Sequence, residues 1–201
     1  GGLVTVNAVY VGEIQLHNLA QPVRWEDPSN SGGFEKLPGQ LRMSRGEYTG
    51  DNIVGPIRLR AHSSDVQLSN FTQSLDLTLD RGDIDLKPGK NPPKMEVHTR
   101  SGDIELTLPA GAKFDLRAST AHGDVNNEYG DPLHEDTSGH GGTLAGGTGG
   151  PQLRLETGRG SITIRKANGD ETTTFPEIPS APNAPKAPKP PNPPELKVER
   201  Q

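Results

Sequence analysis

The sequence predicts an all-β fold: a single-stranded, parallel-type β-solenoid (β-helix) with repeats of about 20 residues and a disordered Pro-rich C-terminal tail. Three observations lead to this prediction. A turn-and-strand motif recurs along the chain, apolar and polar residues alternate within each copy, and glycine and proline are abundant. An antiparallel β-sandwich is the alternative fold.

Composition favours many short strands and little helix. Glycine (25) and proline (19) make up 44 of the 201 residues, and only 29% of the chain is hydrophobic, with a mean hydropathy of −0.70. Runs of strong helix formers are missing, so short strands joined by turns are expected. The hydrophobic core must therefore be thin.

Charge and residue content exclude several functional classes. The net charge is −5 and the basic residues are scattered, which argues against nucleic acid as a partner. No apolar run approaches the roughly 18 residues that would predict a membrane-spanning helix. The absence of cysteine excludes disulfides, thiolate catalysis and cysteine zinc sites. We expect any signal or anchor segment to lie upstream of Gly1.

The repeat is clearest in a Gly-Asp turn, which is Ser-Asp in the first copy, followed by one or two inward-facing aliphatic residues. Its aspartates, with one serine, stand at 65, 83, 103, 124 and 161, in steps of 18, 20, 21 and 37 residues. The last step is interpreted as one period plus an insertion. A second strand series, starting at 75, 95, 114 and 153, lies between these turns, so each period holds two strands. Stacking the copies would align their aliphatic residues in one continuous core.

The repeats predict two segments along the chain: a β-repeat domain over 1–170 and a disordered tail over 171–201. Less regular strands are expected at the N-terminal end, and two segments are interpreted as loops. The strands are Val4–Tyr10, Glu13–Leu16, Gln40–Met43 and Pro56–Leu59; the loops are Pro22–Gly39 and the glycine-dense Gly139–Gly150, the latter expected to be mobile. The many prolines after Phe175 favour an extended segment without a core.

Two segments give the pattern a family resemblance. The segment 101–112 reads SGDIELTLPAGA, and the last copy runs from GGPQLRLET at 149–157 to ITIRK at 162–166. With the repeated Gly-Asp-Ile/Val turns, they resemble the bacterial putative-adhesin family of β-strand-repeat proteins, a domain of unknown function. The resemblance covers roughly residues 50–166 well and 3–50 loosely. Ser161 departs from it, because the family's usual Gly-Asp is Gly-Ser there.

The resemblance implies a secreted or membrane-attached domain without established activity. We therefore expect a non-enzymatic structural or adhesion module of the cell envelope, periplasmic or on the cell surface. Its partner would be an unknown protein or polysaccharide. Two alternatives stay open: a carbohydrate-active β-helix enzyme, because that architecture hosts enzymes with paired carboxylates, and an envelope-stress sensor that recruits a partner through its Pro-rich tail.

The turn aspartates Asp83, Asp103 and Asp124 are the one candidate metal site. In a regular stack they would lie about 4.8 Å apart, where bare carboxylates repel one another. Either turn amides neutralise each carboxylate, which we favour, or the column holds Ca²⁺. No catalytic residue and no cofactor is predicted.

Other motifs are explained more simply by structure than by function. Arg81-Gly82-Asp83 spells a cell-attachment tripeptide, but the same turn recurs elsewhere without the arginine. His122, His134 and His140 could converge on a metal, although solvated loop histidines are the commoner outcome. Trp25, the sole tryptophan, is expected to close one end of the core, with sugar stacking as the alternative.

Overall fold

The computed structural model of the chain describes residues 4–7, 14–26, 30–44 and 46–167. The chain divides into two units, Gly1–Gly169 and Asp170–Gln201, and all of the described residues belong to the first unit. The tail predicted for 171–201 lies outside the described residues. The described part contains strands and turns and no helix, so the all-β prediction is confirmed.

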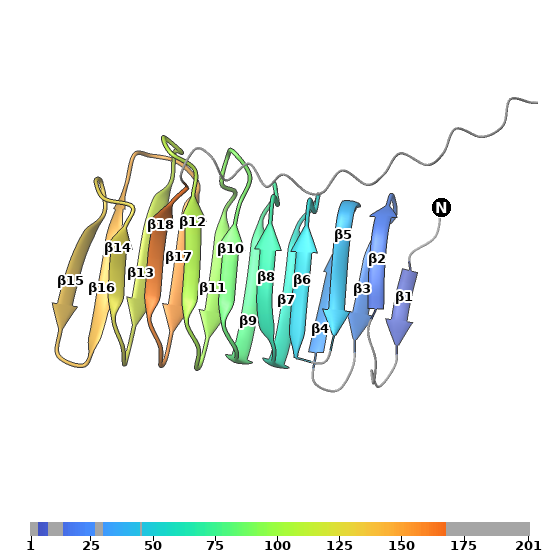
Figure 1. Cartoon of the computed structure of the whole chain (residues 1–201), viewed down its shortest axis with the longest axis horizontal. Helices are drawn as coiled ribbons and strands as arrows, with labels where there is room; N and C mark the ends of the chain where they lie inside the picture. Colours follow the sequence, from blue (N-terminus) through green and yellow to red (C-terminus); the bar gives the residue numbers. More distant parts are fainter. Residues whose placement is uncertain (1–3, 8–13, 27–29, 45, 168–201) are drawn as a thin grey trace, which may run out of the picture. The chain divides into compact units, whose positions relative to one another are not determined.

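The strands form two sheets that share one hydrophobic core (Figure 1). In spatial order, sheet A contains β1 (Val4–Asn7), β3 (Val23–Glu26), β4 (Asn30–Phe34), β7 (Ile57–Ser63), β9 (Leu75–Arg81), β11 (Met95–Thr99), β17 (Gln152–Thr157), β13 (Asp115–Thr120), β16 (Gly141–Gly147) and β15 (His134–Ser138). Sheet B contains β14 (Val125–Glu128), β18 (Ile162–Lys166), β12 (Ile104–Leu108), β10 (Ile84–Lys87), β8 (Asp65–Ser69), β6 (Glu47–Asp51), β5 (Leu37–Ser44) and β2 (Ile14–Leu19).

The middle of each sheet is parallel, because successive copies of the repeat stack in register. In sheet A, β7, β9, β11, β17 and β13 pair in parallel, and in sheet B the same holds from β6 to β14. Register pairs Ile84 with Ile104, and Ile104 with Ile162. These three side chains are at most 2% exposed. Because side chains along a strand point alternately to its two faces, every second residue of these strands lies in the core.

Both ends of the described unit depart from the parallel pattern. At one end β3, β4 and β7 pair antiparallel, as do β2, β5 and β6; at the other end β13, β16 and β15 do. The parallel pairing expected of a parallel-type solenoid is therefore found in the middle strands and between β1 and β3, while these antiparallel strands depart from it. The alternative of an antiparallel sandwich is wrong for the same middle strands, although two sheets do face each other across the core.

The last copy of the repeat does not follow the earlier copies in space. Strand β17 lies between β11 and β13, and β18 lies between β12 and β14. The 37-residue step does contain an insertion, as interpreted, but the copy that follows it lies between the two preceding copies instead of beyond them. The intervening chain forms the β15/β16 hairpin, and the chain then returns into the middle of both sheets (Figure 1).

Two segments interpreted as loops are strands in the structure. Gly141–Gly147 is β16, which pairs with β13 and β15, so the mobile-loop prediction for Gly139–Gly150 is wrong. The predicted loop Pro22–Gly39 contains β3 and β4 and the start of β5. Glycine is compatible with β4 because Trp25 fills the space: a Cβ at Gly32 would lie 2.2 Å from the Trp25 ring.

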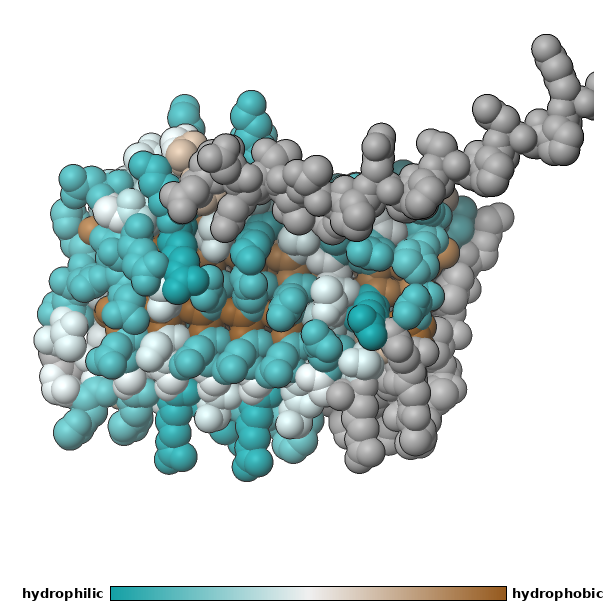
Figure 2. All heavy atoms as spheres, viewed as in Figure 1, coloured by the Kyte–Doolittle hydropathy of each residue, from teal (hydrophilic) through white to brown (hydrophobic). Residues whose placement is uncertain are grey.

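Trp25 packs inside the core, as the sequence predicted. Its ring stacks on Tyr48 with centroids 6.2 Å apart, and it also contacts Phe34. Only 8% of the residue is exposed. On the face seen in Figure 2, polar residues cover most of the surface and hydrophobic residues show as a narrow band between them. Any ligand of this surface must therefore be recognised mainly by polar contacts.

Candidate functional site

The outer face of sheet A carries polar side chains in straight rows. Because the strands are in register, one row runs from Asp76 through Glu96 and Arg154 to Arg117, one residue from each of four neighbouring strands. Neighbouring strands lie about 4.8 Å apart, so such a row presents charges at regular intervals. Paired strands hold the backbone beneath it, which fixes the geometry of the face.

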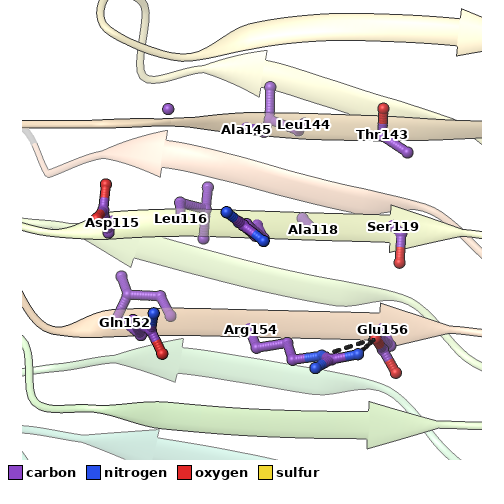
Figure 3. A pocket seen from close by; sticks show the side chains of 13 residues that line it. Asp115, Leu116, Ala118, Ser119, Thr143, Leu144, Ala145, Gln152, Arg154 and Glu156 are labelled. Atoms are coloured by element: carbon purple, nitrogen blue, oxygen red, sulfur yellow. Dashed lines mark hydrogen bonds and ion pairs between the residues drawn. The ribbon is translucent and has the colours of Figure 1, made fainter.

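A hollow of about 610 Å³ opens on this face over β17, β13 and β16 (Figure 3). It exists because β16 turns small residues outward: Thr143 and Ala145 lie opposite Ser119 and Arg117 of β13. Its rim also includes Gln152, which lies opposite Asp115. The volume is within the range of roughly 300–1,000 Å³ that small-molecule sites occupy.

Arg117 is the positively charged residue of this hollow that can bind a ligand, because its neighbour Arg154 is already paired. Its register neighbour Arg154 is held by Glu156, with the Nε–Oε1 distance at 2.8 Å and a guanidinium N–Oε1 distance of 2.6 Å. The hydrogen bond that Arg154 donates to the Glu156 carboxylate raises the pKa of the Arg154 guanidinium. Arg117 is exposed and forms no ion pair within the described part of the chain. It can donate to an acceptor on a ligand.

The hollow offers recognition groups and no recognisable catalytic set. Hydroxyls of Ser119 and Thr143, the Gln152 amide, the Asp115 carboxylate and the Arg117 guanidinium can donate and accept hydrogen bonds. None of these pairs a nucleophile with a base in the described residues, where the hollow holds no histidine. The arrangement is suited to binding a polar ligand.

The turn aspartates form a ladder of hydrogen bonds along the edge of sheet B at which its parallel strands begin. The Oδ1 atom of Asp65 accepts the backbone N–H of Asp83 at 2.9 Å, and Oδ1 of Asp83 accepts that of Asp103 at 2.9 Å. Oδ1 of Asp103 then accepts the N–H of Ser161 at 2.7 Å. Each carboxylate thus binds the next turn of the stack.

Asp124 does not continue the column as the sequence suggested. Strand β18 lies between β12 and β14, so Ser161 separates Asp103 from Asp124 and the expected contact between those two carboxylates is absent. Within the described residues no group of three or more His, Asp or Glu side chains is arranged to hold a metal ion. The calcium alternative stays a prediction to be tested.

The turns that carry Asp83 and Asp103 need glycine. Gly102 has a φ of +144°, and a Cβ there would lie 2.0 Å from the carbonyl oxygen of Gly82 in the neighbouring turn. The tripeptide Arg81-Gly82-Asp83 sits in this stack, with both the N–H and the carboxylate of Asp83 bonded to other turns. Stacking of turns therefore explains why Gly-Asp recurs.

The remaining candidates are dispersed. His134 lies on β15, and His122 and His140 lie in turns; all three are exposed. On sheet B the carboxylates Glu105 and Glu128 are both held by Arg165, at 2.5 and 2.8 Å. These pairs tie β18 to both of its neighbours.

The hollow could not be predicted from the sequence because it is formed by the small side chains of β16, a segment that was expected to be a loop. Alternation in the segment 115–120 already places Arg117 and Ser119 on the outer face. What was not predicted is that the glycine-rich segment pairs beside them. A glycine-rich stretch with Thr and Ala at every second position, Thr143 and Ala145, was the available signal of a strand.

The Toastrack DUF4097 family matches residues 38–165, which is more than half of the chain. The chain belongs to this family. The match confirms the resemblance to a β-repeat domain of unknown function. It covers the parallel middle, the β15/β16 hairpin and the strands that line the hollow of the toastrack domain.

Comparison with solved structures and with curated proteins adds one remote similarity. A crystal structure titled a "putative cell adhesion protein" from Clostridium sporogenes ATCC 15579 shares 15% sequence identity with this toastrack chain, at a TM-score of 0.46. The similarity covers 82% of this chain and 89% of that one. No curated protein matches the sequence. In the described residues, no helix is long and apolar enough to cross a membrane.

Proposed function

We propose that this toastrack domain is a non-enzymatic binding module of the bacterial cell envelope, structural or adhesive, which holds its ligand against the outer face of sheet A. The observation that carries the proposal is the open hollow beside Arg117. It places an unpaired guanidinium, two hydroxyls and an amide over strands held in register. The ligand would be a protein or polysaccharide of the envelope.

The carboxylates support binding over glycoside chemistry. Hydrolysis of a glycoside needs two carboxyl groups, one of them a proton donor, about 5–9.5 Å apart on either side of the scissile bond. Here Asp83 and Asp103 accept backbone amides, Glu105 binds Arg165, and Asp85 lies 3.2 Å from the Lys87 ammonium. These engagements give each carboxylate a structural role.

The proposal extends to architecture and location. We infer that the domain is built as a parallel β-solenoid of about 20 residues per turn, closed at its ends by antiparallel hairpins. The acidic residues of β15, Glu135 and Asp136, protect that edge from pairing with other chains. We also propose an extracytoplasmic location, with membrane attachment of the full-length protein, which the family resemblance supports.

A binding assay tests the function. The purified chain is incubated with envelope fractions, and bound protein is compared with an R117A/S119A variant and with Gln67→Ala, an exposed residue of sheet B as control. The proposal expects loss only with R117A/S119A. Equal retention of all three proteins would overturn it. A chain ending at Gly169 tests the sensor alternative, which requires residues 170–201, and turnover on a polysaccharide panel tests the enzyme alternative.

A further inference from the structure

A second, larger hollow lies on the outer face of sheet A, over β4. Its volume is about 860 Å³, and it is lined by residues of β3, β4, β7 and β9. The cause is again the small residues of one strand: Ser31 and Gly33 are the residues of β4 that pair with the outward-facing Glu26 and Arg24 of β3. The strands on either side, β3 and β7, are two strand spacings apart, or about 10 Å.

Three arginines surround this hollow. Register places Arg24 and Arg58 on opposite sides of Gly33, while Arg60 lies opposite Ser31. All three arginines are exposed and line the hollow. A guanidinium reaches a carboxylate or phosphate through two parallel hydrogen bonds, so three of them can converge on one anionic group above the short residues of β4.

These arginines differ from others that face solvent on the two sheets. Arg100 binds Asp80, Arg154 binds Glu156, and Arg165 binds Glu105 and Glu128. Within the described residues, Arg24, Arg58 and Arg60 form no ion pair, although carboxylates line the same hollow. The hollow therefore keeps its cations available for a ligand.

The carboxylates set a limit on the ligand's charge. Glu26, Glu35 and Asp76 also line the hollow, so the lining has three positive and three negative side chains and no net charge. A densely charged polyanion would meet as much repulsion as attraction there. A ligand with one carboxylate and several hydroxyls would satisfy both sets, because its hydroxyls can donate to the carboxylates.

A sugar on this face would not be held by stacking on an aromatic side chain. All six aromatic residues in the described part of the chain are at most 9% exposed. Trp25 lines the hollow, but it is 8% exposed, and its buried indole N–H has no acceptor among the described residues. A neutral sugar, which depends on an aromatic platform, would find none here.

We propose that the hollow over β4 binds an acidic sugar, such as a uronic acid residue of an acidic polysaccharide, with Arg24, Arg58 and Arg60 holding its carboxylate. Glu26, Glu35 and Asp76 accept from its hydroxyls. The inference rests on the proposed role of this face of sheet A in binding and adds a second site with a ligand class of its own. The site is distinct from the hollow beside Arg117, so the two can be tested separately.

Calorimetric titration of the full chain with a galactose oligomer that ends in one galacturonic acid residue tests the assignment. Saturable binding is expected, and an R58Q/R60Q variant should weaken it at least about tenfold, because each charge-assisted hydrogen bond contributes strongly. Arg159→Gln, an exposed arginine that lines neither hollow, is the matched control and should retain affinity. Arg24→Gln is the second site variant. Unchanged thermal unfolding of each variant excludes misfolding.

Three additional ligands make the test decisive. A galactose oligomer of the same length should not bind, and inorganic phosphate and a pentaglutamate peptide should bind more weakly than the uronate. Equal binding of the neutral oligomer, equal loss in Arg159→Gln, or tighter binding of phosphate or the peptide would each overturn the assignment. If uronate binds as expected but envelope fractions do not, the proposed function fails and the sugar site stands; the reverse result removes the sugar site alone.

Discussion

The carboxylate of Asp103 accepts a hydrogen bond of 2.7 Å from the backbone N–H of Ser161, although 58 residues separate the two in the chain. The contact exists because β18 pairs with β12 in parallel and places its turn directly beside that of Asp103. Thr157, at the end of β17, donates from its hydroxyl to the carbonyl oxygen of Gly102 in the same turn at 3.0 Å. Together these bonds hold the returning chain in its place.

Replacing Asp103 should measure this link. Asp103→Asn keeps an oxygen acceptor and should lower the free energy of unfolding by about 1 kcal/mol, and Asp103→Ala should lower it by more because the Ser161 N–H loses its partner. Asp124→Ala is the control, since that carboxylate makes no hydrogen bond in the described residues. Urea denaturation gives the three values. Similar losses for alanine at 103 and at 124 would contradict the ladder.

Calcium should have no effect on stability. Each turn supplies one carboxylate, Ser161 interrupts the series, and calcium needs about six to eight oxygen ligands. We expect the same Tm in millimolar calcium and in chelator. A rise of several degrees with calcium, abolished by Asp103→Asn, would instead establish a metal site in this column.

Acid should remove the contribution of Asp80. The Nδ1 atom of His62 lies 2.6 Å from Oδ2 of Asp80, and this hydrogen bond holds the pKa of the carboxyl below its ordinary value of 3.8, with Arg100 adding to the effect. A carboxyl with a depressed folded-state pKa stabilises the fold above its unfolded pKa and loses that stabilisation as pH falls through the folded value.

Asp80→Asn should therefore lower the urea midpoint at pH 7 and make a smaller difference at about pH 3. Asp76→Asn, on the same strand and without an ion pair in the described part, controls for loss of a surface charge. A difference that is equal at both pH values would show that Asp80 acts through something other than its charge.

Alternation predicted strands and their inward residues correctly wherever side chains carried the pattern. Ile84, Ile104 and Ile162 were expected inside, and each is buried. The order of copies was not predictable in the same way. All copies present similar aliphatic pairs, so β13 fits beside β11 or beside β17, and the choice depends on how the β15/β16 hairpin returns the chain. The path of the hairpin is set by contacts between residues far apart in the sequence, and the pattern of apolar residues within one strand carries no information about such contacts.

The glycines of β4 and β16 are the reason why the sequence pattern did not predict these strands, which shape the two hollows. In β4 and β16 glycines replace most of the large side chains that make alternation easy to recognise, because neighbouring side chains or backbone occupy their space. Gly32 faces the Trp25 ring, and Val125 lies close to Gly142, where a Cβ would come within 2.8 Å of it. Composition alone suggests a loop in such segments. The candidate site could therefore be recognised only after β3 and β13 had been placed beside them.

Gly32→Ala should disturb the Trp25 packing. The added methyl would lie 2.2 Å from the ring, so the ring must shift, and overpacking of this kind costs about 1–3 kcal/mol. The shift should change tryptophan fluorescence, which reports on this one residue. Gly89→Ala is the control, because its nearest neighbour would be 3.2 Å away and on a side chain. Unchanged stability and fluorescence in Gly32→Ala would contradict the packing described.

The insertion of β17 between β11 and β13 can be tested by cross-linking, because the chain has no cysteine of its own. Glu96 lies opposite Arg154, and Arg154 lies opposite Arg117, so Glu96 and Arg117 are separated by one whole strand. Neighbouring strands are about 4.8 Å apart, within the Cα range of a disulfide, whereas a separation of about 10 Å exceeds its limit near 7 Å. Under mild oxidation E96C/R154C should therefore form a disulfide and E96C/R117C should not, as judged by electrophoretic mobility with and without reductant. In a stack that followed the sequence order, β13 would pair with β11 and the E96C/R117C variant would cross-link instead. That outcome would also remove the Asp103 to Ser161 bond, because Ser161 reaches Asp103 only when the last copy lies inside the stack.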